Sequence, residues 1–298
     1  MPVMTLYPGI EPYASGMVDA GAGKSDGRHG CIRNSAEAWP CGAQGSSACT
    51  WRSTTQHGTR VGTMRISRHG PRLVQLTRYP TVFPMNCYLV VEDDGLTLVD
   101  STTGSPASEI VALAEELGLE LRRVALTHSH GDHAGGVAGV RDRFPGVEVS
   151  IGERDARLLA GDKRLDEGEP QTPVKGYFVK VDWKPDRLLR PGDRVGSLEV
   201  VPSSGHTPGH VSFLDARDRT LIAGDAFQTR GGMAVSGVLR PLFPFPAFAT
   251  WSKPTALATA EALRELRPSR LAVGHGNVLQ DPVAAMDRAI ETARRAFR

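Results

Sequence analysis

The sequence predicts a mixed α/β (α+β) protein with two similar halves, and two observations support this fold class. From Arg72 onward, short apolar segments that favour strands alternate with segments whose apolar residues recur at helical spacing. In addition, residues 88–100 and 213–225 share one pattern, in which two apolar strands flank an acidic turn and end on an aspartate. This repeat predicts two halves that end their strands at a shared cleft.

Composition is typical of a globular protein. The chain has 298 residues, of which 40% are hydrophobic, so it can form one large domain with an appendage. The formal net charge of +2 gives no reason to expect a nucleic-acid partner. No apolar run reaches membrane-spanning length and no signal peptide opens the chain, so we expect no membrane association and a cytoplasmic location.

The first 63 residues differ from the remainder, because they lack periodicity and are rich in small residues, so we predict an irregular extension. Residues 6–16 resemble the opening of proline iminopeptidases, but no Gly-x-Ser-x-Gly motif follows. We hypothesise a fusion scar, a frame-shifted remnant or an over-long start, with Met64 as the natural first residue of a working domain at 64–298. Cys31, Cys41 and Cys49 match no zinc-knuckle spacing, and Cys87 fits a core position.

The first half contains alternating elements in the order expected for a sheet covered by helices. A helix begins at Ser105 or Pro106 and stops at Gly118, with apolar residues on one face. A second helix follows Gly136, and a third covers residues 153–159. The predicted strands are residues 73–76, 87–91, 96–100, 124–126 and 147–151. Asp100 ends one of them, where it either orients a metal ligand or caps the loop.

The strongest signal in the chain is the segment from residue 127 to 136. It places His128, His130, Asp132 and His133 between a buried strand and a helix, with glycines beside them. Imidazole and carboxylate at this density suit zinc or a similar divalent metal. His128 and His130 can face one metal, whereas Asp132 and His133 can face a second.

The second half supplies the remaining candidate ligands. Residues 161–190 lack a clear period and predict a surface excursion beside the active site, before a strand at 198–201. The rigid turn Gly-His-Thr-Pro-Gly-His at 205–210 presents His206 as a third ligand, and we expect His210 to support a ligand or pack. Asp225 ends the repeated hairpin, where it could bridge two metals.

The C-terminal part is predicted to contain a pocket wall and a last ligand. In residues 241–248 phenylalanines alternate with prolines, and we expect this segment to be too stiff for a helix. It predicts a gate or wall of an apolar substrate pocket. A homodimer contact or a cover over the core are the alternatives. A helix at 255–266, a strand at 271–273 and a helix from Pro282 follow. His275 stands between glycines at a strand end, as the other ligand histidines do.

Together the motifs resemble those of the metallo-β-lactamase fold superfamily over about residues 72–298. The resemblance implies a four-layer αββα sandwich. Carried over by motif, the resemblance implies that His128, His130 and His206 hold one metal. It implies that Asp132, His133 and His275 hold the other, and that Asp225 bridges the two.

The resemblance also implies the chemistry. Two Zn²⁺ ions, with iron or manganese as alternatives, would share a bridging hydroxide that cleaves a small ester, lactone or thioester, with Asp132 and Asp225 as catalytic residues. The bridging aspartate favours the lactonase and glyoxalase II branches. Related acyl-homoserine lactonases have a tyrosine where Phe227 and Gln228 stand. We predict that the small-molecule substrate contacts four aromatic residues, Phe227, Phe243, Phe245 and Phe248.

Three alternatives remain open at this point, whereas glyoxalase II itself is disfavoured. A single-iron oxidative enzyme, such as a persulfide dioxygenase, would need a Gly-Arg-Thr-Asp stretch that the chain lacks. Glyoxalase II has a sizeable C-terminal glutathione-binding domain, whereas only one helix follows His275. A phosphodiesterase of the RNase Z kind would have a basic surface, and a non-catalytic binding module would keep the fold without turnover.

Overall fold

The computed structural model describes residues 59–61 and 63–298, so the iminopeptidase-like stretch and Cys31, Cys41 and Cys49 lie outside the described residues. Strand β1 (Thr59–Val61) pairs antiparallel with β2 (Met64–His69). The sheet therefore begins before Met64, inside the segment predicted to be irregular. Sequence analysis missed both strands because they are short and contain three arginines, which interrupt any continuous apolar signal.

Within this part of the chain, eight strands form the first sheet in simple chain order. The pairs from β1 to β5 are antiparallel, whereas β5 to β8 run parallel because helical crossovers connect most of them. The remaining strands of this sheet are β3 (Leu73–Arg78), β4 (Met85–Glu92), β5 (Gly95–Val99), β6 (Leu121–Leu126), β7 (Glu148–Gly152) and β8 (Arg187–Leu189).

The second sheet has the strand order β16-β15-β12-β11-β10-β9, and β13 (Phe227–Gln228) pairs separately with β14 (Ala234–Val235). Its pairs are antiparallel except for β12 and β15, which are parallel. The strands are β9 (Arg194–Val195), β10 (Leu198–Pro202), β11 (Val211–Asp215), β12 (Thr220–Ile222), β15 (Arg270–Ala272) and β16 (Leu279–Gln280). The predicted repeat is confirmed, because β4–β5 and β11–β12 are both antiparallel hairpins.

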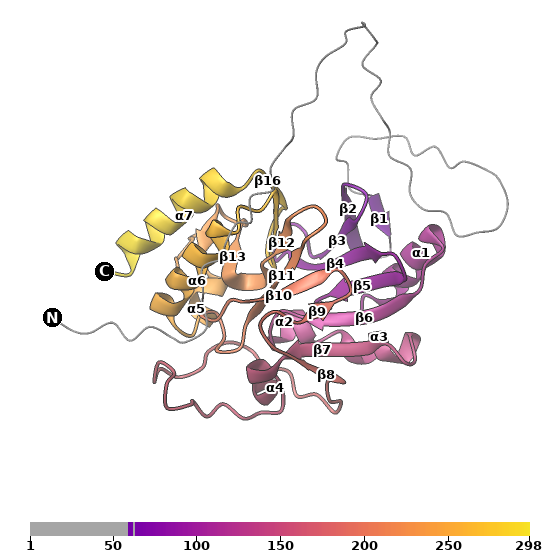
Figure 1. The fold of residues 1–298 in the computed structure, drawn as a ribbon, viewed down its shortest axis with the longest axis horizontal. Coiled ribbons are helices and arrows are strands. Elements are labelled where there is room, and N and C mark those ends of the chain that lie inside the picture. The colour runs from indigo at the N-terminus through magenta and orange to yellow at the C-terminus, as the bar shows by residue number, and fades with distance from the viewer. Residues whose placement is uncertain (1–58, 62) are drawn as a thin grey trace, which may run out of the picture. The chain divides into compact units, whose positions relative to one another are not determined.

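Three apolar clusters hold these sheets and helices in four layers (Figure 1). Helices α1 (Ala107–Leu117) and α3 (Val137–Arg143) cover the outer face of the first sheet, and α6 (Lys253–Glu265) and α7 (Val283–Ala296) cover the second. The inner faces meet through a cluster that includes Tyr88, Val90, Phe213 and Ile222. Strands β4 and β12 alternate between an outer and an inner cluster, as a two-sided sheet requires. The predicted αββα sandwich is confirmed.

Three short helices lie beside the candidate site: α2 (Gly131–Ala134), α4 (Glu153–Leu159) and α5 (Phe245–Ala249). Helix α5 corrects the prediction that residues 241–248 are too stiff for a helix. Pro244 precedes this helix and Pro246 lies in its first turn, where a missing N–H breaks no intrahelical hydrogen bond. Among the residues placed in the structure, no helix is both long and apolar enough to cross a membrane.

Candidate metal centre

Seven predicted ligands meet at one end of the inter-sheet layer. The first half contributes His128 and His130 from the loop after β6, and Asp132 and His133 from α2. The second half contributes its ligands from three separate segments: His206 and His275 lie in loops, and Asp225 lies in the short 3₁₀ helix η1 (Gly224–Ala226). Six of the seven side chains are almost wholly buried, whereas the side chain of Asp132 is 23% exposed. The strands thus deliver residues far apart in sequence to one point, as predicted.

The first group consists of three imidazole rings whose inner nitrogens converge. His130 Nδ1 lies 3.1 Å from His128 Nε2 and 3.0 Å from His206 Nε2. The outer nitrogens each face another partner: His130 Nε2 lies 2.9 Å from the Lys175 carbonyl, and His206 Nδ1 lies 2.9 Å from Ser236 Oγ. Since a carbonyl only accepts hydrogen bonds, the His130 proton sits on Nε2, and its Nδ1 presents a lone pair to the centre.

The same reasoning fixes the other two tautomers of the first group. Thr250 donates to the Pro246 carbonyl, so Ser236 donates to Thr250 and accepts from His206 Nδ1. Thr127 donates to Asp100 and accepts from His128 Nδ1. Three lone pairs therefore point at one another over about 3 Å, an arrangement that is repulsive unless a cation lies between them. The donor set fits a divalent metal such as zinc.

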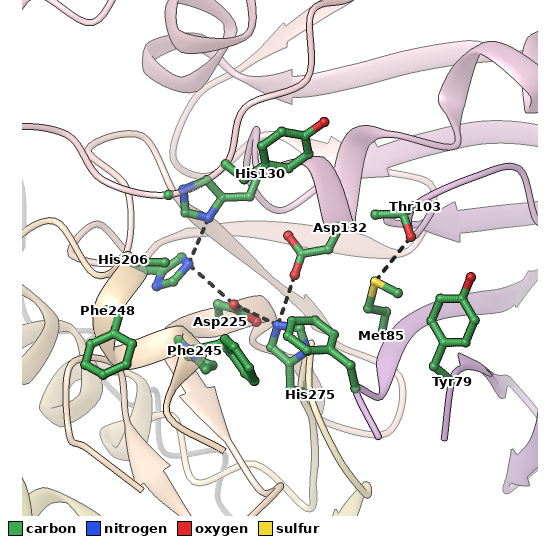
Figure 2. A pocket seen from close by; sticks show the side chains of 15 residues that line it. Tyr79, Met85, Thr103, His130, Asp132, His206, Asp225, Phe245, Phe248 and His275 are labelled. Carbon is green, nitrogen blue, oxygen red and sulfur yellow. Dashed lines mark hydrogen bonds and ion pairs between the residues drawn. The ribbon is translucent and has the colours of Figure 1, made fainter. Parts of the chain in front are cut away.

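The second group contains Asp132, His133 and His275, with Asp225 between it and the first group. His275 Nε2 lies 3.3 Å from Asp132 Oδ2 and 3.2 Å from Asp225 Oδ2. Asp225 Oδ2 also lies 3.4 Å from His206 Nε2, and Asp225 Oδ1 lies 3.5 Å from His133 Nε2. Figure 2 shows Asp225 between His206 and His275. Both groups therefore share this carboxylate, the geometry that the bridging role requires.

Two buried polar atoms beside the shared carboxylate face each other at 3.5 Å without forming a hydrogen bond: His133 Nε2 and Asp225 Oδ1. Buried polar atoms are normally satisfied, so a ligand is expected to contact both. Although burial opposes protonation, the carboxylates of Asp100, Asp225 and Asp132 outweigh it and raise the pKa of His133 to about 9. Burial chiefly lowers the pKa of His128 and His206. The second group thus attracts positive charge, and the first group offers neutral imidazoles; both conditions suit a metal.

Asp100 and His210 support ligands without contributing to the two groups. Asp100 Oδ2 lies 2.8 Å from His133 Nδ1, and its Oδ1 accepts the backbone N–H of Thr127 at 2.8 Å. It therefore orients His133 and also holds the ligand loop. His210 Nε2 accepts the backbone N–H of Asp225 at 3.1 Å, which favours the supporting role that we predicted for this histidine.

The position of His275 is set from the opposite half of the molecule. The side chain of Asn86, on β4, donates to the carbonyls of Val273 and Gly276, each at 2.8 Å. Tyr88 Oη donates to the Val273 carbonyl at 2.7 Å. His275 Nδ1 donates to the Pro84 carbonyl at 2.7 Å, so its Nε2 faces the carboxylates. First-sheet residues therefore hold the last ligand in place.

Asp155, at the start of α4, connects the two ligand loops, and sequence analysis missed it. Its Oδ2 accepts from the backbone N–H and the hydroxyl of Ser129, at 2.8 and 2.9 Å. Its Oδ1 accepts the backbone N–H of Gly209 at 2.9 Å. Ser129 lies between His128 and His130, and Gly209 follows His206 by three residues, so one buried carboxylate fixes both loops. The available signal was an acidic residue in the first turn of the helix that follows β7.

The excursion between α4 and β8 lies against the metal centre, as predicted. We call its residues 172–178 the strap. At one end Trp251 Nε1 donates to the Thr172 carbonyl at 2.9 Å. At the other end the backbone N–H of Gly131 donates to the Tyr177 carbonyl at 2.8 Å, and Phe178 forms a β-bridge with His130. The strap thereby joins the second half to the first and supplies the carbonyl that orients His130.

Gly176 gives a test of this arrangement. Its φ is +102°, and a Cβ at this position would collide with the His130 imidazole. We expect Gly176→Ala to weaken metal binding at the first group about ten- to a hundredfold, the range seen when residues that orient ligands are lost. Metal titration checks this, with Gly168→Ala as the control, because a Cβ at Gly168 meets nothing within 4 Å. Unchanged affinity in Gly176→Ala would contradict the positioning role of the strap.

A cavity of about 550 Å³ opens above the ligands, and Figure 2 shows the side chains that line it. His130, Asp132, His206, Asp225 and His275 form its floor. Two of the four aromatic residues predicted to contact substrate, Phe245 and Phe248, line its wall.

The other two aromatic predictions need correction. Phe227 is fully buried in the outer core of the second half, because β13 turns its side chain toward α6 and α7. Phe243 is also buried; its ring packs 5.0 Å from Phe83 and 5.4 Å from Phe245, behind the cavity wall. Sequence analysis missed Tyr79, Phe83 and Tyr177, which do line the cavity.

The site and the fold together can be compared with known proteins. The sequence profile of the Metallo-beta-lactamase superfamily matches residues 80–275. The chain belongs to this superfamily. Its membership supports a metal-dependent hydrolase, in agreement with the two groups of ligands.

Individual relatives and solved structures differ in how much of the chain they match. The uncharacterized protein YobT of Bacillus subtilis is 48% identical over 78% of this chain and all of its own length. Hydroxyacylglutathione hydrolase GloC of Haemophilus influenzae is 30% identical over 49% of this chain and 68% of its own. The crystal structure of the DIM-1 metallo-beta-lactamase exposed to ceftazidime has a TM-score of 0.60 at 18% identity, over 80% of this chain and all of its own, and shows the fold alone.

Proposed function

We propose that this member of the metallo-β-lactamase superfamily is a dinuclear hydrolase of carboxylic esters, lactones or thioesters. The observation that carries the proposal is the sharing of Asp225 between two groups of ligands beneath one open cavity. Two cations held by one carboxylate can act on the same water and the same carbonyl group. The similarity to a hydroxyacylglutathione hydrolase supports a carboxylic rather than a phosphoric substrate.

Each ligand has a definite part in this reaction. The three histidines of the first group would hold one divalent ion, and Asp132, His133 and His275 the other. Bound divalent ions supply Lewis-acid polarisation and make water a stronger acid. Asp132 is the most exposed ligand and lines the cavity, so its carboxylate can accept a hydrogen bond from the attacking water and orient it.

The chemical balance is that of simple hydrolysis. The water oxygen forms a bond to the carbonyl carbon, the C–O or C–S bond breaks, and the leaving alcohol or thiol takes up a proton. Six of the seven ligands are almost inaccessible, so water reaches the site mainly from the cavity. No serine or cysteine nucleophile is required: Cys87 is buried in the outer core of the first half, away from the cavity.

Elemental analysis combined with a substrate panel tests this function. We expect two divalent ions per chain and turnover of carboxylic esters, lactones or thioesters that is lost with a chelator and restored by zinc. The panel also includes a phosphodiester and a persulfide, which test the phosphodiesterase and the persulfide dioxygenase alternatives. Iron alone with persulfide oxidation, phosphodiester cleavage, or full metal without any turnover would each refute the proposal.

A further inference from the structure

The wall of the cavity differs sharply from its floor. All charged or metal-binding side chains lie on the floor, whereas the wall is formed mainly by aromatic residues from three segments: residues 79–85, the strap and α5. At its mouth the side chains are strongly exposed: Tyr177 is 70% exposed, Phe248 66% and Phe245 52%. Large apolar side chains gathered around one opening indicate a surface that is covered when a ligand binds.

The part of this wall nearest the metal centre is held rigidly. Phe83 packs 5.0 Å from both Phe243 and Phe245, and its ring lies 5.3 Å from that of His275. Phe243 in turn lies 5.2 Å from His275. These contacts fix Phe245 relative to a metal ligand, so an apolar group against Phe245 would place the adjoining carbonyl over the floor.

Positive charge is missing from the wall. Among the residues that the structure describes, no lysine or arginine lines the cavity. Nearby cationic groups contact other partners: Arg230 bonds the Thr81 carbonyl, Arg78 bonds the Ser105 carbonyl, and the Lys163 ammonium lies 4.5 Å from the centre of the Phe178 ring. A carboxylate against this wall would lose water without gaining a lysine or arginine as a counter-ion.

We propose that the site selects uncharged substrates whose acyl group is apolar, and that it discriminates against those whose acyl group bears a carboxylate. The proposal rests on the proposed hydrolytic function and specifies its substrate class. Substrates whose acyl part carries a carboxylate fit the wall poorly, whereas a medium-length alkyl or aryl group would cover Phe245, Phe248 and Tyr177. Specificity then comes from the wall, and reactivity comes from the floor.

A matched pair of substrates tests this with the zinc-loaded full chain. p-Nitrophenyl hexanoate and mono-p-nitrophenyl adipate have the same acyl length and leaving group, and differ in a terminal carboxylate. We expect kcat/KM to favour hexanoate at least about tenfold, since an unpaired carboxylate would be desolvated. From acetate to hexanoate, kcat/KM should rise by up to about fourfold per methylene. Equal rates for hexanoate and adipate would overturn the proposal.

One variant reverses the predicted discrimination. Phe248 is exposed at the mouth, and no ring contact to the buried cluster depends on it, so Phe248→Lys should fold and place a cation on the wall. We expect Phe248→Lys to raise kcat/KM for the adipate ester and lower it for the hexanoate ester, whereas Phe248→Leu should keep the preference for hexanoate. An adipate rate that is the same in Phe248→Lys as in the unaltered chain would count against a role of this wall.

A binding measurement separates this proposal from the hydrolytic one. Hexanohydroxamic acid and adipic acid monohydroxamate both chelate metal, and calorimetry measures their affinity without turnover. If the hexanoyl compound binds about tenfold more tightly but no ester is cleaved, the proposed selectivity of the apolar wall stands and the proposed hydrolytic function is refuted. Cleavage of both esters with equal affinity for both hydroxamates would retain the hydrolase and refute the selectivity.

Discussion

Replacing Asp225 with alanine is expected to remove hydrolysis and most of the second metal. The carboxylate contacts His206 on one side and His275 on the other, so its loss separates the two groups of ligands. Without it, His133 and His275 keep Asp132 as their carboxylate partner, which leaves a weaker site. Since a second Lewis acid contributes several kcal/mol to transition-state stabilisation, kcat/KM should fall roughly a thousandfold.

Metal stoichiometry and activity must be measured on the same preparation of this variant. Asp225→Asn keeps the size of the side chain and one acceptor oxygen, and should bind the second metal more weakly than the unaltered chain. Asp287→Ala, which removes an exposed carboxylate on α7, is the control and should leave both quantities unchanged. Full turnover in Asp225→Ala with two bound metals would disprove the bridging role.

Replacing Asp155 with alanine should have the largest effect on stability. Its carboxylate accepts three hydrogen bonds from Ser129 and Gly209, and alanine would leave these buried donors unpaired. At about 1–3 kcal/mol for each unsatisfied group, incompletely additive, the loss is about 3–5 kcal/mol in the free energy of unfolding. Because the two connected loops carry His128, His130 and His206, metal affinity at the first group should fall as well.

Chemical denaturation of the metal-free chain and metal titration together check this expectation. Asp155→Asn can still accept from one of the two loops, so its stability and metal affinity should lie between those of the alanine variant and the unaltered chain. Asp166→Ala removes a half-exposed carboxylate that pairs with Arg157, and should cost about 1 kcal/mol or less. If the Asp155 and Asp166 variants behave alike, Asp155 does not hold the loops together.

Much of the fold, and the convergence of the seven candidate ligands, could be predicted from the sequence because both follow from local patterns. The buried strand before His128 and the glycines after His133 place the ligand loop at a sheet edge whatever the rest of the chain does. The repeated hairpin predicted that Asp100 and Asp225 end equivalent strands, and both lie beside His133. The capping glycine also predicted the end of α1, because the helix stops at Gly118 as expected.

Features that depend on long-range contacts could not be predicted in this way. Phe227 and Phe245 were both predicted to contact substrate, yet one lies in the outer core and the other lines the cavity. Asp155 resembles any acidic residue in a first helical turn until Ser129 and Gly209 are brought to it. The strap has no apolar pattern from which its position could be predicted. Its position depends instead on contacts with Trp251 and His130.

The contacts of Asn86 and Tyr88 with the backbone around His275 have a consequence for how this protein can vary. A chimera that joined its N-terminal half to the C-terminal half of a relative could retain all seven metal-facing side chains and still misplace the last of them. Whether two parental halves are compatible would then depend on these amide and phenol contacts. A mismatch would lower the amount of bound metal before it impaired folding.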